Sequence, residues 1–159
     1  MSAEHERFMR RAIELARNGV EANLGGPFGC VVVKNGEIVG EGNNQVTSTL
    51  DPTAHAEVVA IREACRKLAS FQLEGCVVYT SCEPCPMCLG AIYWARPERI
   101  FIACNRQDAA AAGFDDEFIY EELCGMDFAA RKVPISMMMR EEALAVFQSW
   151  IEKPDKIDY

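Results

Sequence analysis

Long apolar runs, repeats and linkers are all missing from this sequence of 159 residues. No stretch approaches the roughly 18 uninterrupted apolar residues that a membrane-spanning helix needs, so no membrane association is expected. The first residues, Met1 to Arg11, are charged and helical in pattern with no apolar secretory core after them, which favours a cytoplasmic location. Without repeats or Pro/Ser-rich linkers, residues 1–159 are expected to form one domain with a sizeable core.

Basic residues are also scarce relative to acidic ones. The chain has 16 Lys and Arg against 24 Asp and Glu, a formal net charge of −8. Proteins that bind nucleic acids usually carry a basic patch that displaces phosphate counterions. The balance therefore favours a small-molecule substrate, and no nucleic-acid partner is expected.

Cysteine, in contrast, is plentiful, with eight residues. A disulfide framework is not expected, because the chain can build a core and shows no secretory signal. Free cysteine behaves as a small buried hydrophobe. Five cysteines in apolar surroundings fit that role: Cys30, Cys65, Cys76, Cys104 and Cys124. The other three, Cys82, Cys85 and Cys88, cluster and need another explanation.

Helical and strand patterns alternate along most of the chain after an opening hairpin. Asn35-Gly36 is a strong hairpin signal between two short apolar runs. The alternation predicts a layered α/β sheet with helices on both faces. The expected helices are residues 6–18, 54–68, 109–112, 118–123 and 141–150, with a further helix whose start is bracketed by Pro84 and Pro86 and which runs to about residue 94. The expected strands are residues 30–34, 38–42, 76–80, 100–103 and 133–139.

The clustered cysteines and one histidine have the chemistry of a zinc site. Cys85 and Cys88 stand three residues apart, which places two sulfurs on one face of a helix. The positive end of a helix favours thiolate, the form that binds metal. His55 is expected to supply a nitrogen, which gives three ligands and leaves one position for water, as in catalytic zinc sites.

Glu57 follows His55 by two residues, a spacing that does not place side chains together on a helix flank. Both side chains can converge only if the metal lies off the tip of the helix. We therefore expect two helix N-termini, one bearing His55 and one bearing Cys85, to point at the same place.

His-x-Glu followed by Pro-Cys-x-x-Cys is the signature of zinc-dependent deaminases. Zinc lowers the pKa of bound water from ~15.7 toward ~7. The resulting hydroxide is expected to attack the amino-bearing carbon of the substrate. Glu57, which is not a ligand, would take a proton from the water and deliver protons to a ring nitrogen and the departing amine.

Other uses of the cysteine cluster are open to test. A structural zinc site would have Cys82 as its fourth ligand. The spacing of Cys82, Cys85 and Cys88 is also that of the first three cysteines in a motif that binds an iron–sulfur cluster, but the fourth cysteine of that motif is missing here. An inert buried cluster would leave His55 and Glu57 unexplained.

Several longer segments resemble the cytidine and deoxycytidylate deaminase superfamily and, within it, bacterial guanine deaminases. The segments that carry the resemblance are Gly25-Gly-Pro-Phe-Gly29, Asp51-Pro-Thr-Ala-His55-Ala-Glu57, Tyr79-Thr-Ser-Cys-Glu-Pro-Cys85, Pro86-Met-Cys88-Leu-Gly-Ala, Ala91-Ile-Tyr-Trp-Ala-Arg-Pro97, Ala112-Gly-Phe-Asp-Asp116, Phe118-Ile-Tyr120 and the terminal Tyr159. The central motifs are shared with transfer-RNA adenosine deaminases. The Gly-Phe-Asp-Asp segment and Tyr159 are the more discriminating features.

The resemblance implies a fold, a reaction and an assembly. The fold is a three-layer α/β/α sandwich of the cytidine deaminase type, with a central mixed sheet that we expect to have about five strands. The reaction converts guanine, a purine base, and water to xanthine and ammonia, with one zinc ion per subunit. The assembly is a homodimer in which the C-terminal segment, about residues 125–159, crosses to the partner.

The resemblance also implies a set of residues around the base. Asn44 would hydrogen-bond the purine edge and Phe28 would pack on the ring, while Trp94 would wall the pocket and Ala56 would contact the base. One acid of the Gly-Phe-Asp-Asp segment would contact the base and assist proton transfer; the match fits Asp115 or Asp116, of which Asp116 is preferred. Tyr159 would reach the base from the terminus.

The metal motif specifies deamination but not the base. Alternative substrates are adenosine in transfer RNA, cytosine, and an aminotriazine such as ammeline, because contacts in the pocket set the choice. An alternative of another class is a zinc-stabilised binding module without catalysis.

Overall fold

The computed structural model describes residues 3–125 and 131–157. The contacts within the chain divide it into two compact units, Met1–Asp116 and Glu117–Tyr159. The first unit contains the sheet and the helices against it, and the described residues of the second contain two helices. Each unit is described by itself. That the whole chain acts as one deaminase domain stays a prediction.

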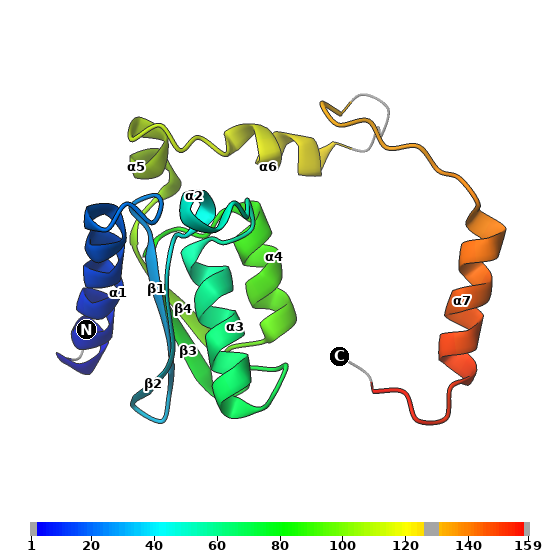
Figure 1. Ribbon diagram of the computed structural model, residues 1–159, viewed down its shortest axis with the longest axis horizontal. Helices are drawn as coiled ribbons and strands as arrows, with labels where there is room; N and C mark the ends of the chain where they lie inside the picture. Colours follow the sequence, from blue (N-terminus) through cyan, green and yellow to red (C-terminus); the bar gives the residue numbers. More distant parts are fainter. Residues whose placement is uncertain (1–2, 126–130, 158–159) are drawn as a thin grey trace. The chain divides into compact units, whose positions relative to one another are not determined.

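The first unit is built on a mixed sheet of four strands, β1 (Gly29–Lys34), β2 (Glu37–Asn43), β3 (Cys76–Cys82) and β4 (Arg99–Cys104). Their order is β2-β1-β3-β4, and only the β3–β4 pair is parallel (Figure 1). The predicted hairpin is confirmed, with Asn35 and Gly36 both at positive φ, 52° and 79°. The α/β fold is confirmed, with four strands in place of about five among the described residues.

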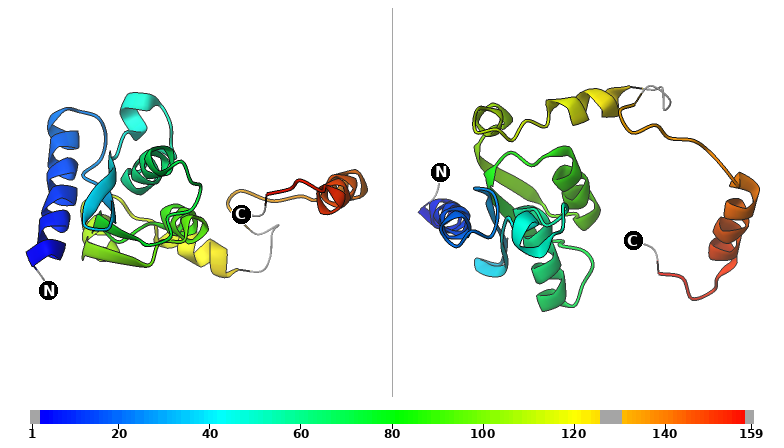
Figure 2. Two further views of the ribbon diagram at one scale, coloured as in Figure 1. Left: turned by 90° about the horizontal axis from the view of Figure 1, so that it is seen from below. Right: turned by 45° about the horizontal axis from the view of Figure 1, so that its top comes forward.

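Helices cover both faces of this sheet. Helix α1 (Ala3–Glu21) lies on one face, and α3 (Ala56–Leu68) and α4 (Pro86–Ala95) lie on the other (Figure 2). The short helices α2 (Val46–Thr49), which the sequence did not predict, and α5 (Arg106–Ala111) complete the unit. Two buried clusters, one between the sheet and each helical layer, form the core. No described helix is long and apolar enough to cross a membrane.

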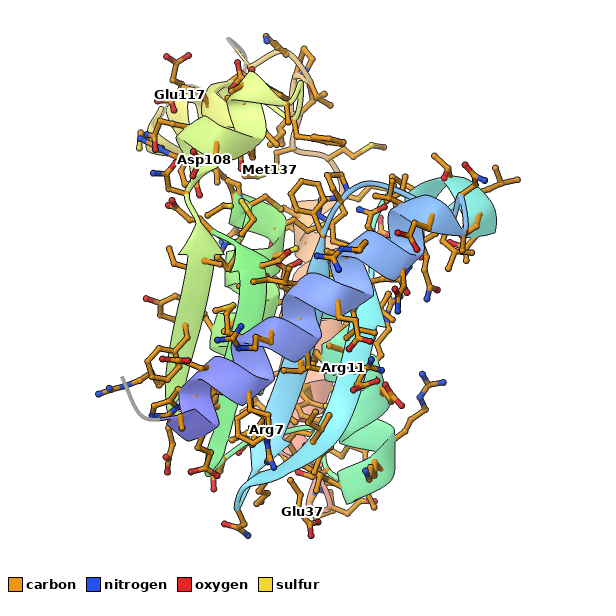
Figure 3. The ribbon with its side chains drawn as sticks, turned by 90° about the vertical axis from the view of Figure 1, so that its left-hand side faces the viewer. Arg7, Arg11, Glu37, Asp108, Glu117 and Met137 are labelled. Atoms are coloured by element: carbon orange, nitrogen blue, oxygen red, sulfur yellow. The ribbon has the colours of Figure 1, made fainter. Side chains whose placement is uncertain are left out.

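Helix α1 is held by apolar packing and by one ion pair. Phe8 and Ala12 are buried, whereas Ile13 is 40% exposed. Arg11 is labelled on α1 in Figure 3. Its side chain donates from Nε and Nη2 to the two carboxylate oxygens of Glu41 on β2, at 2.8 and 2.7 Å. This paired geometry fixes the helix against the edge of the sheet.

Gly42 on β2 lets α3 approach the sheet closely. A Cβ atom at this position would lie 2.2 Å from the backbone oxygen of Ala56, the first residue of α3. The site described below depends on this approach, because His55 immediately precedes Ala56.

Gly42→Ala is expected to lower the free energy of unfolding by about 1–3 kcal/mol, because the added methyl group pushes on backbone rather than on a flexible side chain. Chemical denaturation of the two proteins would measure the loss. Zinc affinity should fall as well, since the start of α3 must shift. An unchanged unfolding free energy would show that α3 is not held as tightly as the close approach indicates.

In its described residues, the second unit contains α6 (Glu117–Cys124) and α7 (Arg140–Glu152). The predicted helices 118–123 and 141–150 are therefore confirmed. The prediction of a strand at Val133–Met139 is wrong, because residues 131–139 form no regular element. A strand exists only when its backbone pairs with another strand, and the described part of this unit contains none.

Candidate active site

Two helix starts carry the predicted zinc ligands. His55 is the N-cap residue of α3 and Cys85 that of α4, and both have extended backbones, with ψ of 156° and 167°. Cys88 lies in the first turn of α4 and is fully buried. His55 Nδ1 lies 3.5 Å from Cys85 Sγ and 3.4 Å from Cys88 Sγ. The expected meeting of two helix N-termini is therefore present.

The surroundings of Cys85 favour its thiolate form. A hydrogen bond from the Cys88 thiol is the main cause and, with the nearby His55, it lowers the pKa of Cys85 to about 4. Thiolate is the form of cysteine that binds metal. A cation could therefore bind without first removing a proton from Cys85 at neutral pH.

The donor set fits zinc with one coordination position left open. The ligand atoms of His55, Cys85 and Cys88 all lie within 4.8 Å of one another, and together they could hold a metal ion. Cys82 is not in this group. Its thiol donates to the backbone oxygen of Asn105 at 3.4 Å, and burial raises its pKa to about 11. One nitrogen and two sulfurs with an open fourth position are typical of a catalytic rather than a structural site.

Glu57 lies beside the metal group in the first turn of α3 and is 5% exposed. Burial raises the pKa of its carboxyl group, because removal from water disfavours the charged form. Its Oε1 accepts a hydrogen bond of 2.9 Å from the hydroxyl group of Thr80 on β3. Thr80 was not predicted, because its sequence context shows only a β-branched residue in a strand.

A cavity of about 330 Å³ opens in front of these residues within the first unit. Its volume is at the lower end of the range for small-molecule sites. The lining residues are Gly26, Phe28, Asn44, Val46, Thr47, His55, Glu57, Glu83, Cys85, Ala109, Phe114, Asp115 and Asp116. Metal ligands, a buried acid and apolar rings thus share one cavity.

Asn44 is buried, and its side-chain oxygen is held by the backbone. Oδ1 accepts hydrogen bonds from the amides of Gly26 and Val46, at 3.1 and 3.2 Å. Because both partners are donors, they fix which end of the amide is oxygen. The Nδ2 group is therefore the end that can donate to a ligand in the cavity.

Two aromatic rings and two acids complete the cavity. The rings of Phe28 and Phe114 meet edge to face, with centroids 5.0 Å apart at 85°. Asp115 and Asp116 both line the cavity. Burial raises the pKa of Asp116, and the negative charge of Cys85 acts in the same direction. Phe114 was not assigned from the sequence, although it lies inside the Gly-Phe-Asp-Asp segment.

Three residues expected at the base are not among those that line this cavity. Trp94 is 66% exposed near the end of α4. Ala56 is fully buried in the core between α3 and the sheet. Tyr159 lies outside the described residues. The structure gives Ala56 and Trp94 no place at the cavity, and the roles of all three residues stay predictions.

His, Cys and Cys at two helix starts beside a buried glutamate, on a layered α/β fold, match the zinc ligands and the non-ligand glutamate of zinc-dependent deaminases. The family model of the cytidine and deoxycytidylate deaminase zinc-binding region matches residues 2–104. The chain belongs to this family. The matched residues include all four strands and the metal group.

Individual relatives extend this match beyond residue 104. Guanine deaminase of Bacillus subtilis (strain 168) is 54% identical over 155 residues, which cover 98% of this chain and 99% of that protein. The X-ray structure of guanine deaminase from Bacillus subtilis is similar with a TM-score of 0.94 and 53% identity, and the match covers 100% of this chain and 99% of that chain. The transfer-RNA-specific adenosine deaminase of Aquifex aeolicus (strain VF5) is 42% identical over 98 residues, which cover 62% of this chain and 64% of that protein.

Proposed function

We propose that this protein is a zinc-dependent guanine deaminase that converts guanine and water to xanthine and ammonia. The observation that carries the proposal is the extent of the match to the guanine deaminase of Bacillus subtilis, which spans 98% of this chain at 54% identity. The transfer-RNA-specific adenosine deaminases of Aquifex aeolicus and Bacillus subtilis match 62% and 75% of this chain, at 42% and 34% identity. A match over 98% of the chain extends beyond residue 104, where the zinc-binding region ends, into the segment in which Phe114, Asp115 and Asp116 line the cavity.

The residues at the cavity have separate roles in the proposed reaction. His55, Cys85 and Cys88 would hold zinc, which supplies a water molecule of lowered pKa when bound. Glu57 takes a proton from the attacking water and passes protons to a ring nitrogen and to the departing amine. Its burial favours the protonated form that the second transfer needs.

The base is held by contacts away from the metal. Asn44 donates from Nδ2 to an acceptor on the purine edge, because its oxygen is already bound to Gly26 and Val46. Phe28 packs on the ring, and Asp116 accepts from the base and assists proton transfer, as expected from the resemblance. The roles of Ala56, Trp94 and Tyr159 are part of the same proposal.

The direct test is turnover by the purified, zinc-loaded protein. Guanine should be converted to xanthine with one ammonia released per base, measured by absorbance and by an ammonia assay. The panel should include cytosine, ammeline and an adenosine-containing transfer-RNA anticodon stem. Turnover of one of these without turnover of guanine would contradict the proposal, and no turnover of any would favour a binding module.

We further infer that the protein is a homodimer that exchanges the C-terminal segment, about residues 125–159. Helix α7 supports this, since none of its described residues is buried although several are apolar. Leu144, Phe147 and Ile151 recur at helical spacing and are 39%, 67% and 61% exposed. A stripe of this kind needs an apolar surface to cover it.

A groove on the first unit is the surface that we propose covers this stripe. The groove, of about 540 Å³, lies beside α1 and the outer strand β4. Its lining includes the apolar side chains of Met9, Ile13 and Phe101 together with His5, Glu6, Arg10 and Tyr79. The partner's α7 is the occupant we propose for this groove. None of the eight cysteines, all of which lie in the described residues, is in a disulfide, which supports the proposed cytoplasmic location.

Exchange of the tail predicts rescue between two impaired proteins. One carries Glu57→Gln, and the other lacks residues 155–159 and with them Tyr159. In a mixed dimer, the intact tail of the first would complete the site of the second. Unfolding and refolding the two together should restore roughly a quarter of wild-type activity, because half of the dimers are mixed and each has one complete site. No recovery in a mixture shown to contain mixed dimers would mean that the tail serves its own subunit.

A further inference from the structure

Thr80 is a buried hydroxyl in an apolar row. Alternate residues of β3 face α3, and two of them, Cys76 and Val78, belong to the core cluster on that side. Thr80 continues the row and pairs across the sheet with Cys30, which is also in the cluster. Its exposed fraction is 1%. A hydroxyl group in such surroundings is costly unless it is hydrogen-bonded.

The partner of this hydroxyl is the carboxyl group of Glu57. Thr80 Oγ1 donates to Glu57 Oε1 at 2.9 Å, across 23 positions of sequence. Both side chains are at most 5% exposed, so water does not compete for the bond. A hydrogen bond to a carboxylate in these conditions is stronger than one at the surface.

The bond also restricts how the carboxyl group can turn. The last torsion of a glutamate side chain is broad, so an unsupported carboxyl group samples many orientations. Proton transfer requires one oxygen within hydrogen-bond reach of the reacting group. Fixing Oε1 therefore determines where Oε2 lies.

We propose that Thr80 is the positioning residue of the proton carrier: its hydroxyl group holds Oε1 of Glu57 so that Oε2 is presented to the reacting water and amine. The proposal rests on the proposed deaminase function. It assigns Thr80 no contact with the base, because Thr80 is not among the residues that line the cavity.

The test compares Thr80→Val, which keeps the shape and removes the hydroxyl group, with Thr80→Ser, which keeps the hydroxyl group. With guanine as substrate, Thr80→Val should lower kcat by about 10- to 100-fold, the usual effect of losing one hydrogen bond to a charged group. KM should change little, because the base contacts are intact. Thr80→Ser should recover most of kcat. Equal kcat values for Thr80→Val and the wild type, at equal zinc content, would overturn the proposal.

Val78→Ala is the matched control, because it opens a cavity two residues away on the same row. It should lower the midpoint of thermal unfolding and leave kcat unchanged at temperatures where the protein is folded. If Thr80→Val only loses stability or zinc, and its zinc-loaded fraction has wild-type kcat, Thr80 is structural. If the wild type deaminates another base and not guanine, the proposed guanine deaminase function is wrong. The role of Thr80 can then still be tested, by measuring kcat of Thr80→Val and Thr80→Ser with that other base.

Discussion

Glu57→Gln is expected to lower kcat by at least about 100-fold while zinc stays bound, because proton transfer by a positioned acid or base contributes roughly 100- to 10,000-fold. Glutamine has nearly the same shape and can still accept the hydrogen bond of Thr80, but it cannot carry a proton. The side chain is not part of the metal group, so the metal content should not change. Steady-state kinetics and metal analysis of the purified variant measure both quantities.

Glu63→Gln is the matched control for this variant. Glu63 lies on the same helix α3, is exposed and accepts a hydrogen bond from the backbone amide of Glu41, which glutamine can also accept. It should keep wild-type kcat. Full turnover by zinc-loaded Glu57→Gln would contradict its role as the proton carrier, and would favour a site that needs another base.

Cys85→Ser should abolish stoichiometric zinc binding and, with it, turnover. Even the loss of a partner outside the ligand shell typically costs about 10- to 100-fold in metal affinity, and Cys85 is expected to be a ligand itself. Serine retains the size of the side chain but not the thiolate, whose pKa is lowered to about 4 at this position. Metal analysis after dialysis against a graded series of chelator concentrations would measure the loss.

Cys82→Ser separates a catalytic site from a structural one. Cys82 stands three residues before Cys85, but its thiol donates to the backbone oxygen of Asn105. A serine hydroxyl can donate in the same way, so this variant should retain one zinc ion per subunit and most of its activity. Loss of zinc from Cys82→Ser as well would make Cys82 the fourth ligand, and the site would then be structural.

Local sequence signals predicted most of the first unit but not all of its packing. The hairpin at Asn35-Gly36 was predictable because its turn requires positive φ, which these residue types tolerate. The strand expected at Val133–Met139 was not formed. Its apolar residues satisfy the pattern, but Pro134 lacks a backbone donor, and pairing depends on a neighbouring strand that local sequence does not specify.

The metal group was predictable because its ligands belong to short sequence motifs with a characteristic spacing. His55, Cys85 and Cys88 come together as their spacing indicated. The rest of the cavity depends on contacts between distant segments. A threonine in a β-branched run looks like any strand residue, so the bond from Thr80 to Glu57 could not be found from the sequence.

The N-cap positions of α3 and α4 carry expected metal ligands where residues that stabilise a helix are usually found. An N-cap position favours Ser, Thr, Asp or Asn, whose side chains accept from the free amides of the first turn and stabilise the helix by about 0.5–2 kcal/mol. At α3 and α4 these positions are occupied by His55 and Cys85, and neither side chain makes such a bond. Asparagine or aspartate at these two positions would raise the free energy of unfolding but would remove two of the three expected metal ligands. Substitutions that stabilise these two helices most readily are therefore the ones that selection for activity would remove.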